Sequence, residues 1–213
     1  MHNYIVTRFS VHNPNNISFN RPYPPEVLFN KERLDFKFKV FDMMTYPSIK
    51  NQTSQNYTWW IFTSQDLPEE YSKKLDSYAD SNIQIIRVNS DSKIGQYIGN
   101  KLKDEKNYCT IRIDDDDGLS PDFLMNLQKY ENETGKIVSF PYGRYFRLTD
   151  EIEYGNIQYF PKQSAGLCGI GLNIFSAGNH RKVNEKFEVI YDNTPESYYV
   201  CCSNFCVTKR KFR

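Results

Sequence analysis

The chain has 213 residues, with 27 Lys and Arg against 26 Asp and Glu. This length suits one domain with a substantial core, and a net charge of +1 argues against a nucleic-acid partner. The five irregularly spaced cysteines disfavour a zinc site and are typical of reduced thiols. With no secretory signal and no apolar run of membrane-spanning length in the sequence, we expect a cytoplasmic protein.

The first half of the chain alternates short apolar strands with helices. Strands are predicted at residues 4–7, 59–63, 83–88 and 108–113, and helices at 26–44, 68–78 and 92–103. We expect the first helix to end before the Tyr-Pro-Ser-Ile segment at 46–49, followed by a short helical turn. This β-α-β order favours a parallel sheet with right-handed crossovers.

The second half is more mixed. Its pattern predicts a helix at residues 121–130, a strand at 136–140 and an aromatic-rich hairpin formed by 142–148 and 153–160. A segment rich in small residues at 163–172 is followed by a predicted helix ending near residue 186 and by strands at 187–191 and 198–205. The fold class is therefore α/β: a mostly parallel central sheet flanked by helices, with a smaller mixed portion. We expect a single domain over residues 1–213.

Four consecutive aspartates, Asp114 to Asp117, follow the strand at 108–113. Gly118 and a Ser-Pro helix start come directly after them. A strand that ends in these acids delivers them to the carboxyl edge of the sheet, where open α/β sheets bind their ligands. Carboxylate oxygens at such an edge suit Mg²⁺ or Mn²⁺ carrying a substrate phosphate.

Several interpretations of this acidic run compete. A solvated acidic turn needs no ligand. An EF-hand loop has its glycine at the sixth position, so Gly118 would put the apolar Ile113 at the first, which excludes that site. A two-metal nuclease needs further acids on other strands. An Asp-x-Asp clamp would hold a metal ion that neutralises the diphosphate leaving a nucleotide sugar.

Residues 110–123, Thr-Ile-Arg-Ile-Asp-Asp-Asp-Asp-Gly-Leu-Ser-Pro-Asp-Phe, resemble the signature of the rhamnosyltransferase family of bacterial glycosyltransferases. Thr-Arg-Phe-Ser at 7–10 is similar to the family's opening motif. Arg33, the 46–49 segment, Gln52 and the Trp59-Trp60 strand follow in the family's order. The resemblance covers about the first two-thirds of the chain. It implies a GT-A fold, with a nucleotide-sugar-binding half at 1–120 and an acceptor-binding half at 121–213.

The same resemblance implies a reaction and its partners. A sugar would move from a nucleoside-diphosphate donor to a glycan or glycolipid acceptor in bacterial surface polysaccharide synthesis, with Mn²⁺ or Mg²⁺ as cofactor. A single displacement with inversion is favoured over retention. Two rivals stay open: a non-catalytic module of the same fold that binds a nucleotide sugar or glycan, and a metal-dependent phosphodiesterase.

Site residues follow from the resemblance as well. Metal binding is expected of Asp114 and Asp116. Donor binding is expected of Thr7, Arg8, Asp66, Arg112 and Asp114. Asp117 is expected to have a catalytic role, either as a nearby support or by orienting the acceptor. Asp115 is expected to tolerate substitution best.

The catalytic base is not selected by the sequence. The family pattern predicts a His-x-x-Asn-like segment near 197–207, but cysteine or serine stands at the expected histidine. His180 is then the remaining histidine for a metal or acid–base role, and Asp150 is one of several acids in the second half that could take the acceptor proton. The basic tail at 209–213 predicts peripheral contact with anionic lipid headgroups at the inner face of a membrane.

Overall fold

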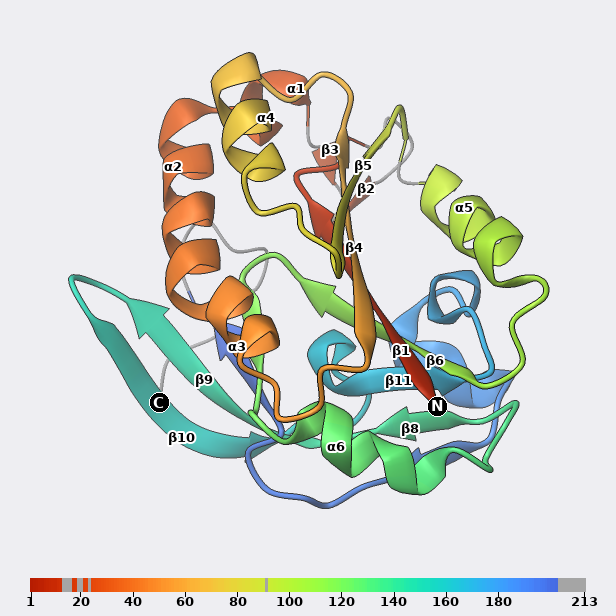
Figure 1. Ribbon diagram of the computed structural model, residues 1–213. Coiled ribbons are helices and arrows are strands. Elements are labelled where there is room, and N and C mark those ends of the chain that lie inside the picture. The colour runs from red at the N-terminus through yellow and green to blue at the C-terminus, as the bar shows by residue number, and fades with distance from the viewer. Residues whose placement is uncertain (13–16, 19–20, 23, 91, 203–213) are drawn as a thin grey trace.

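The main sheet has seven strands in the order β12-β8-β11-β6-β1-β4-β5 (Figure 1). The computed structural model describes residues 1–12, 17–18, 21–22, 24–90 and 92–202. β11 runs antiparallel to both of its neighbours, and the other neighbouring pairs are parallel. The predicted α/β class with a mostly parallel sheet is confirmed. The strands are β1 (His2–Phe9), β4 (Tyr57–Ser64), β5 (Ile83–Val88), β6 (Tyr108–Asp114), β8 (Ile137–Ser139), β11 (Leu167–Ile170) and β12 (Val189–Tyr191).

Helices cover both faces of this sheet because its strands are apolar on both sides. Ile5, Trp59 and Ile61 pack in one core cluster with α2 (Lys31–Val40), α3 (Tyr46–Lys50), α4 (Glu69–Asp76) and α6 (Phe123–Leu127). Val6 and Trp60, their neighbours along the strands, pack in a second cluster with α5 (Ser92–Leu102). Figure 1 shows α2 and α4 on one side of the sheet and α5 on the other.

The first long helix differs from its prediction at both ends. The chain forms α1 (Pro25–Leu28) and then starts again at α2, because the Asn30 side chain accepts a hydrogen bond from the Arg33 N–H and caps the new helix. Pro47 does not end the helix. A π-helical turn, η1 (Phe41–Thr45), leads directly into α3, and Pro47 lies in the first turn of α3.

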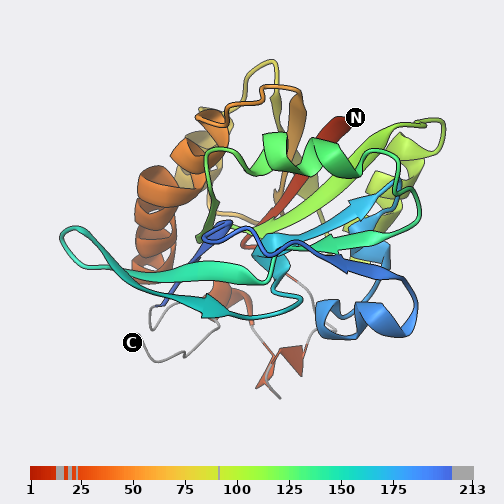
Figure 2. The ribbon, with the colours of Figure 1, turned by 90° about the horizontal axis from the view of Figure 1, so that it is seen from below.

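A second sheet packs beside the first, in the order β10-β9-β13-β7. It contains the predicted hairpin of β9 (Tyr142–Leu148) and β10 (Ile152–Tyr159), together with β13 (Tyr198–Cys201) and the unpredicted β7 (Asp117–Leu119). Figure 2 shows the hairpin extending past the main sheet toward α2. The end of the strand predicted at 198–205 lies outside the described residues.

Short elements complete the fold. They are β2 (Ile17–Ser18), β3 (Arg21–Pro22), and the 3₁₀ helices η2 (Gln128–Tyr130), η3 (Ser164–Gly166), η4 (Ile174–Ser176) and η5 (His180–Glu185). The helix predicted to end near residue 186 is therefore a 3₁₀ helix, capped by the Asn179 side chain. Among the described residues, no helix is long and apolar enough to cross a membrane.

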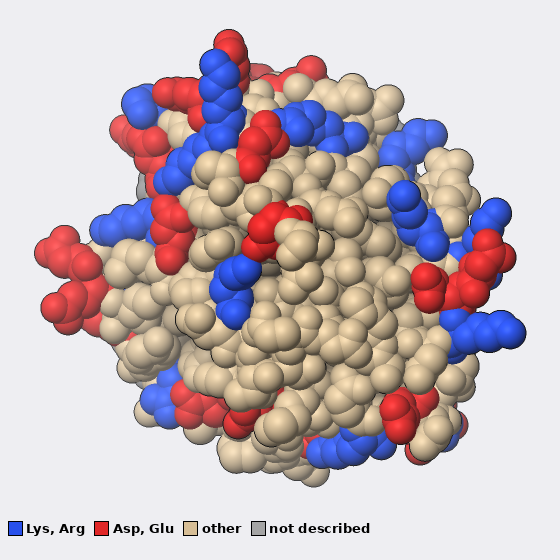
Figure 3. All heavy atoms as spheres, viewed as in Figure 1, with Lys and Arg blue, Asp and Glu red and all other residues tan. Residues whose placement is uncertain are grey.

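Charged side chains do not gather by sign on the face seen in Figure 3. Basic and acidic groups alternate around its edge, and its centre is largely uncharged. The predicted basic tail at 209–213 lies outside the described residues.

Candidate active site

The site lies where the order of the sheet reverses. From β1 the chain adds β4 and then β5 on one side, and it returns to add β6 on the other side of β1. β1 and β6 therefore flank the topological switch point, and their carboxyl ends form the edge at which open α/β sheets bind ligands. Asp114 ends β6 at this edge, and the parallel register pairs it with Arg8 on β1.

Asp114 is surrounded by polar groups and remains partly open. Its Oδ1 lies 3.3 Å from Nη2 of Arg8 and 3.8 Å from Nη2 of Arg112. Ser164 donates a hydrogen bond from Oγ to Oδ2 at 3.3 Å. The side chain keeps 32% of its surface exposed. Burial alone would raise the pKa of Asp114, but Arg112, Arg8 and Lys37 outweigh burial and hold that pKa well below its ordinary value.

The next two aspartates point to a different partner. Nζ of Lys37, on α2, lies 2.6 Å from Oδ1 of Asp115 and 2.8 Å from Oδ2 of Asp116. All three residues are buried. Burial raises the pKa of Asp115, and the charge of Asp116 raises it further, against the opposing effect of Lys37. The expectation that Asp115 tolerates substitution best does not agree with this position, because a change there disturbs a buried ion pair.

The helix that carries Lys37 also holds the rest of the acidic turn. Thr45 donates a hydrogen bond from Oγ1 to the backbone carbonyl of Asp115 at 3.2 Å. Ser48 Oγ accepts a hydrogen bond from the Leu119 N–H at 3.2 Å. A Cβ on Gly118 would lie 2.7 Å from the Met44 sulfur, so a larger residue there would require the Met44 side chain to move. The π-helical turn and α3 thus position the turn that connects β6 to β7.

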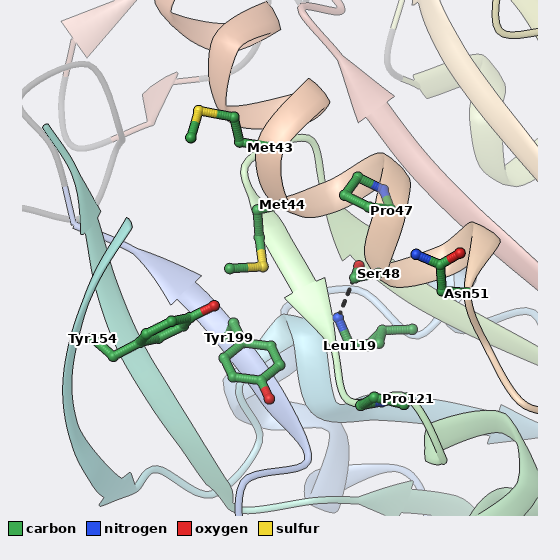
Figure 4. Close-up of a pocket in the computed structure, with 9 residues that line it drawn as sticks. All are labelled: Met43, Met44, Pro47, Ser48, Asn51, Leu119, Pro121, Tyr154 and Tyr199. Carbon is green, nitrogen blue, oxygen red and sulfur yellow. Dashed lines mark hydrogen bonds between the residues drawn. The ribbon is translucent and has the colours of Figure 1, made fainter. Parts of the chain in front are cut away.

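A shallow, mainly apolar pocket of about 240 Å³ lies behind this turn (Figure 4). Figure 4 shows the helix side chains facing Tyr154 and Tyr199 across it. The pocket is lined by Met43, Met44, Pro47, Ser48, Asn51, Leu119, Pro121, Tyr154 and Tyr199. It contains none of the charged residues at the carboxyl edge, so it is separate from the site around Asp114.

His180 is the first residue of η5, and the charges of Arg112 and Asp114 act on its imidazole ring. Its Nδ1 lies 2.6 Å from the carbonyl oxygen of Lys162, so Nδ1 carries the proton and Nε2 keeps its lone pair. Burial lowers the pKa of His180, and the charge of Arg112 lowers it further, against the raising effects of the bond to Lys162 and of Asp114. The lowered pKa favours the neutral imidazole, and the charges of Arg112 and Asp114 both act on it.

The other predicted residues are more scattered. Thr7 is fully buried and accepts a hydrogen bond from the Trp59 indole N–H at 2.9 Å, so its side chain is a core group with no surface for a donor. Asp66 is exposed in the turn after β4, at the same edge of the sheet as Arg8. Asp117 is buried on β7, opposite Val200 of β13.

Asp150 lies apart from all of these. It is exposed in the turn between β9 and β10, and Figure 2 shows this hairpin end projecting from the body of the molecule. The neighbouring Thr149 carbonyl accepts a hydrogen bond from Lys39 of α2, not from a group of the site. The position gives Asp150 no contact with the donor edge.

Three residues of the site were not found by sequence reasoning. Lys37 lies one helical turn from the buried Leu34 and Phe41. A lysine on the apolar face of a predicted helix could therefore have identified it as a buried cation. Arg33 donates from Nη1 to Ser10 Oγ at 3.0 Å and to the Leu28 carbonyl at 2.6 Å, and its charge acts on Asp115. Ser164 lies in the small-residue segment 163–172, but nothing in the sequence linked it to Asp114, because η3 reaches Asp114 only through the pairing of β11 with β6.

The residues present fit one kind of metal site. In the described part of the chain, no three His, Cys, Asp or Glu side chains form a group able to hold a metal ion. Mg²⁺, however, is commonly bound through one or two carboxylates together with substrate phosphates and water. Asp114 offers such a carboxylate, beside two guanidinium groups suited to a diphosphate. Asp116 has one oxygen bonded to Lys37, so its metal role stays a prediction.

A family comparison decides the assignment. The profile of the family described as "Putative rhamnosyl transferase" matches residues 6–205. The chain belongs to this family. The resemblance seen in the first two-thirds of the sequence therefore extends over nearly the whole chain, and membership places the rhamnosyl transferase homologue among the glycosyltransferases. A search of curated proteins found no match.

Solved structures of TarS from S. aureus share the fold of this rhamnosyl transferase family member. The complex of TarS 1–349 with UDP has a TM-score of 0.53 and 11% identity, over 95% of this chain and 61% of that one. The complex of TarS 1–349 with UDP-GlcNAc has a TM-score of 0.54 and 9% identity, over 96% of this chain and 59% of that one. This chain thus spans less than two thirds of TarS 1–349, and the likeness establishes the GT-A fold.

Proposed function

We propose that this chain transfers a sugar from a nucleoside-diphosphate donor to a glycan or glycolipid acceptor, with the donor diphosphate bound at Arg8, Arg112 and Asp114. The observation that carries the proposal is the pairing of Arg8 with Asp114 at the switch point of the sheet. Membership of the rhamnosyl transferase family supports the reaction. The UDP and UDP-GlcNAc complexes of TarS, which has the same fold, support a nucleotide sugar as the donor class.

The donor side needs groups that attract a diphosphate. The two guanidinium groups beside Asp114 can each donate paired hydrogen bonds to phosphate oxygens. Asp114, ionised because its pKa is lowered, would hold Mg²⁺ or Mn²⁺ together with the diphosphate. The ion would supply neutralisation of the charge that develops on the leaving diphosphate. Asp66, in the turn that follows β4, is proposed to contact the base or ribose of the donor.

The reaction also needs a base that accepts the proton of the acceptor hydroxyl. In the proposed single displacement, an acceptor hydroxyl oxygen forms a bond to the anomeric carbon as the bond from that carbon to the diphosphate oxygen breaks. The electron pair leaves with the diphosphate, and the hydroxyl proton passes to a base. We propose His180 as this base, because its Nδ1 donates to the Lys162 carbonyl, which leaves Nε2 with a lone pair, and because the charge of Asp114 acts on the ring. Asp117 remains a proposed support of the acceptor, and Asp150, exposed in the turn between β9 and β10, is the less favoured base.

The site of action is a further proposal. We place the reaction in surface polysaccharide synthesis at the inner face of a membrane, with the basic residues 209–213 as the contact to anionic lipid. Vesicle sedimentation with and without these residues tests that placement.

The test of the reaction is a panel of nucleotide sugars incubated with the purified chain and Mn²⁺, with the nucleotide products separated by chromatography. The proposal predicts slow release of nucleoside diphosphate. Asp114→Asn should abolish release, whereas Asp104→Asn, an exposed carboxylate beside Lys103, should not change it. Nucleoside monophosphate as the product would instead identify a phosphodiesterase. Tight nucleotide binding without turnover on any donor and acceptor would identify a binding module.

A further inference from the structure

Lys37 is a buried lysine that faces two carboxylates at once. Its side chain is 6% exposed, and those of Asp115 and Asp116 are 7% and 11% exposed. Both N–O distances, 2.6 and 2.8 Å, are those of charge-assisted hydrogen bonds. The ammonium group therefore meets two carboxyl groups in a place with little access to water.

We propose that Lys37 is a positioning residue that serves as the resident counter-cation of Asp115 and Asp116, and that it closes this carboxylate pair to a divalent ion. The inference rests on the proposed function in one respect. With Asp115 and Asp116 closed, Asp114 is the carboxylate left to hold the metal ion that accompanies a donor. Asp115 and Asp116 then form a structural pair, and Asp114 is the open metal ligand of the acidic run.

The geometry supports a fixed role for the lysine. Leu34, Phe38 and Phe41 of the same helical stretch are buried in the main core, so the Lys37 backbone is held in place. Thr45, on the η1 turn that follows α2, donates a hydrogen bond to the Asp115 carbonyl. A divalent ion at this pair would have to displace an ammonium group that is buried with its two partners. Asp114, in contrast, keeps 32% of its side chain exposed.

Removing the lysine charge should reverse this selectivity. Lys37→Met keeps a long apolar side chain but removes the ammonium group that bonds both buried carboxylates, which is costly. We expect its melting temperature in chelator to fall by roughly 6–20 °C. Mn²⁺ alone, without nucleotide, should recover much of that loss, because the ion can now occupy the vacated position.

The experiment is a set of thermal melts of the full chain in chelator and in Mn²⁺, together with Mn²⁺ titration by electron paramagnetic resonance. Lys39→Met is the matched control, because Lys39 lies on the same helix, is exposed and contacts only a backbone carbonyl among the interactions described. The wild type and this control should bind no Mn²⁺ tightly and should melt at the same temperature with and without it. Lys37→Met should bind one ion. Equal stabilisation of the wild type and Lys37→Met by Mn²⁺ would overturn the proposal.

A double variant keeps the test decisive if Lys37→Met does not fold. Lys37→Met with Asp115→Asn removes one of the two unbalanced carboxylates, so it should melt above Lys37→Met or fold where the single variant does not. A double variant that is no better than the single one would also reject the assignment. Neither measurement contains a donor, so failure here leaves the transferase proposal intact, and failure to release nucleoside diphosphate leaves the role of Lys37 intact.

Discussion

Arg8 and Asp114 are register neighbours on β1 and β6, the two parallel strands that flank the switch point of the sheet, and their side chains meet at 3.3 Å. Neither side chain is deeply buried, with 27% and 32% of their surfaces exposed. An ion pair this open contributes little to stability. The pair lies at the carboxyl edge of the sheet, where we propose that Arg8 binds the diphosphate of the donor and Asp114 binds its metal ion.

Replacing Arg8 should therefore affect binding far more than stability. We expect Arg8→Met to raise the Kd for a nucleoside diphosphate with Mn²⁺ by roughly 10- to 100-fold, since a charge-assisted hydrogen bond contributes about 1.5–3 kcal/mol. Isothermal titration calorimetry measures the change. Arg87→Met is the control, because Arg87 lies on β5 and pairs with Asp76 away from the site. Equal affinities for the two variants would remove Arg8 from the donor site.

Nucleotide and metal should stabilise the chain only together. Asp114 alone is a poor site for a free divalent ion, and it becomes a site when a diphosphate completes the coordination. UDP or dTDP should therefore raise the melting temperature in Mn²⁺ but not in chelator, and Asp114→Asn should remove the effect. Stabilisation of the same size in chelator would show that the arginines bind the nucleotide without a metal ion.

Gly166 is predicted to be intolerant of a side chain. A Cβ there would lie 2.5 Å from the Phe140 carbonyl oxygen and 2.8 Å from the Tyr198 ring, so neither neighbour can give way easily. Gly166→Ala should lower the free energy of unfolding by about 1–3 kcal/mol and weaken nucleotide binding, because it displaces η3 and Ser164. Urea denaturation and calorimetry test both effects.

Gly99→Ala is the matched control for that variant. Gly99 lies within α5, and a Cβ there would meet only the Asn173 amide at 3.8 Å. Alanine should leave stability unchanged or raise it by up to about 1 kcal/mol, because it favours the helix. If both glycine variants lose the same stability, the close approach at Gly166 is not the cause.

The pH dependence of stability should report on His180. Its pKa is lowered in the fold by burial, whereas a histidine in the unfolded chain titrates near about 6.5. The unfolded chain therefore binds the proton more readily, and the stability linked to neutral His180 is present above pH ~6.5 and is lost as the pH falls through the folded pKa.

Unfolding free energies from pH 5 to 7.5 would measure this effect, and the pH dependence should become shallower in His180→Gln. A nuclear magnetic resonance titration should place the His180 midpoint below about 6.5. A midpoint above that value would contradict both the buried environment and the role of Nε2 as a base at neutral pH.

The order of elements and the position of the acidic run could be predicted from the chain alone. Apolar strands and helices alternate and are separated by recognisable turn and capping residues. A mostly parallel sheet therefore follows from the local sequence pattern. The four aspartates stand at the end of a predicted strand, which placed them at the ligand edge before any contact was known. Thr7 shows the limit of this reasoning, because a residue at the end of a strand can face the core as easily as the ligand.

Tertiary structure decided the different environments of the four aspartates. Side-chain charge depends on partners that lie far along the chain: Lys37 reaches Asp115 and Asp116 across 78 and 79 positions, and Arg8 reaches Asp114 across 106. The sequence alone determined that a cluster of carboxylates ends the fourth strand of an α/β sheet. Only the packing of α2 and the register of β1 with β6 decided which of them is buried against a lysine and which remains open, because burial and opposite charge are properties of neighbours in space.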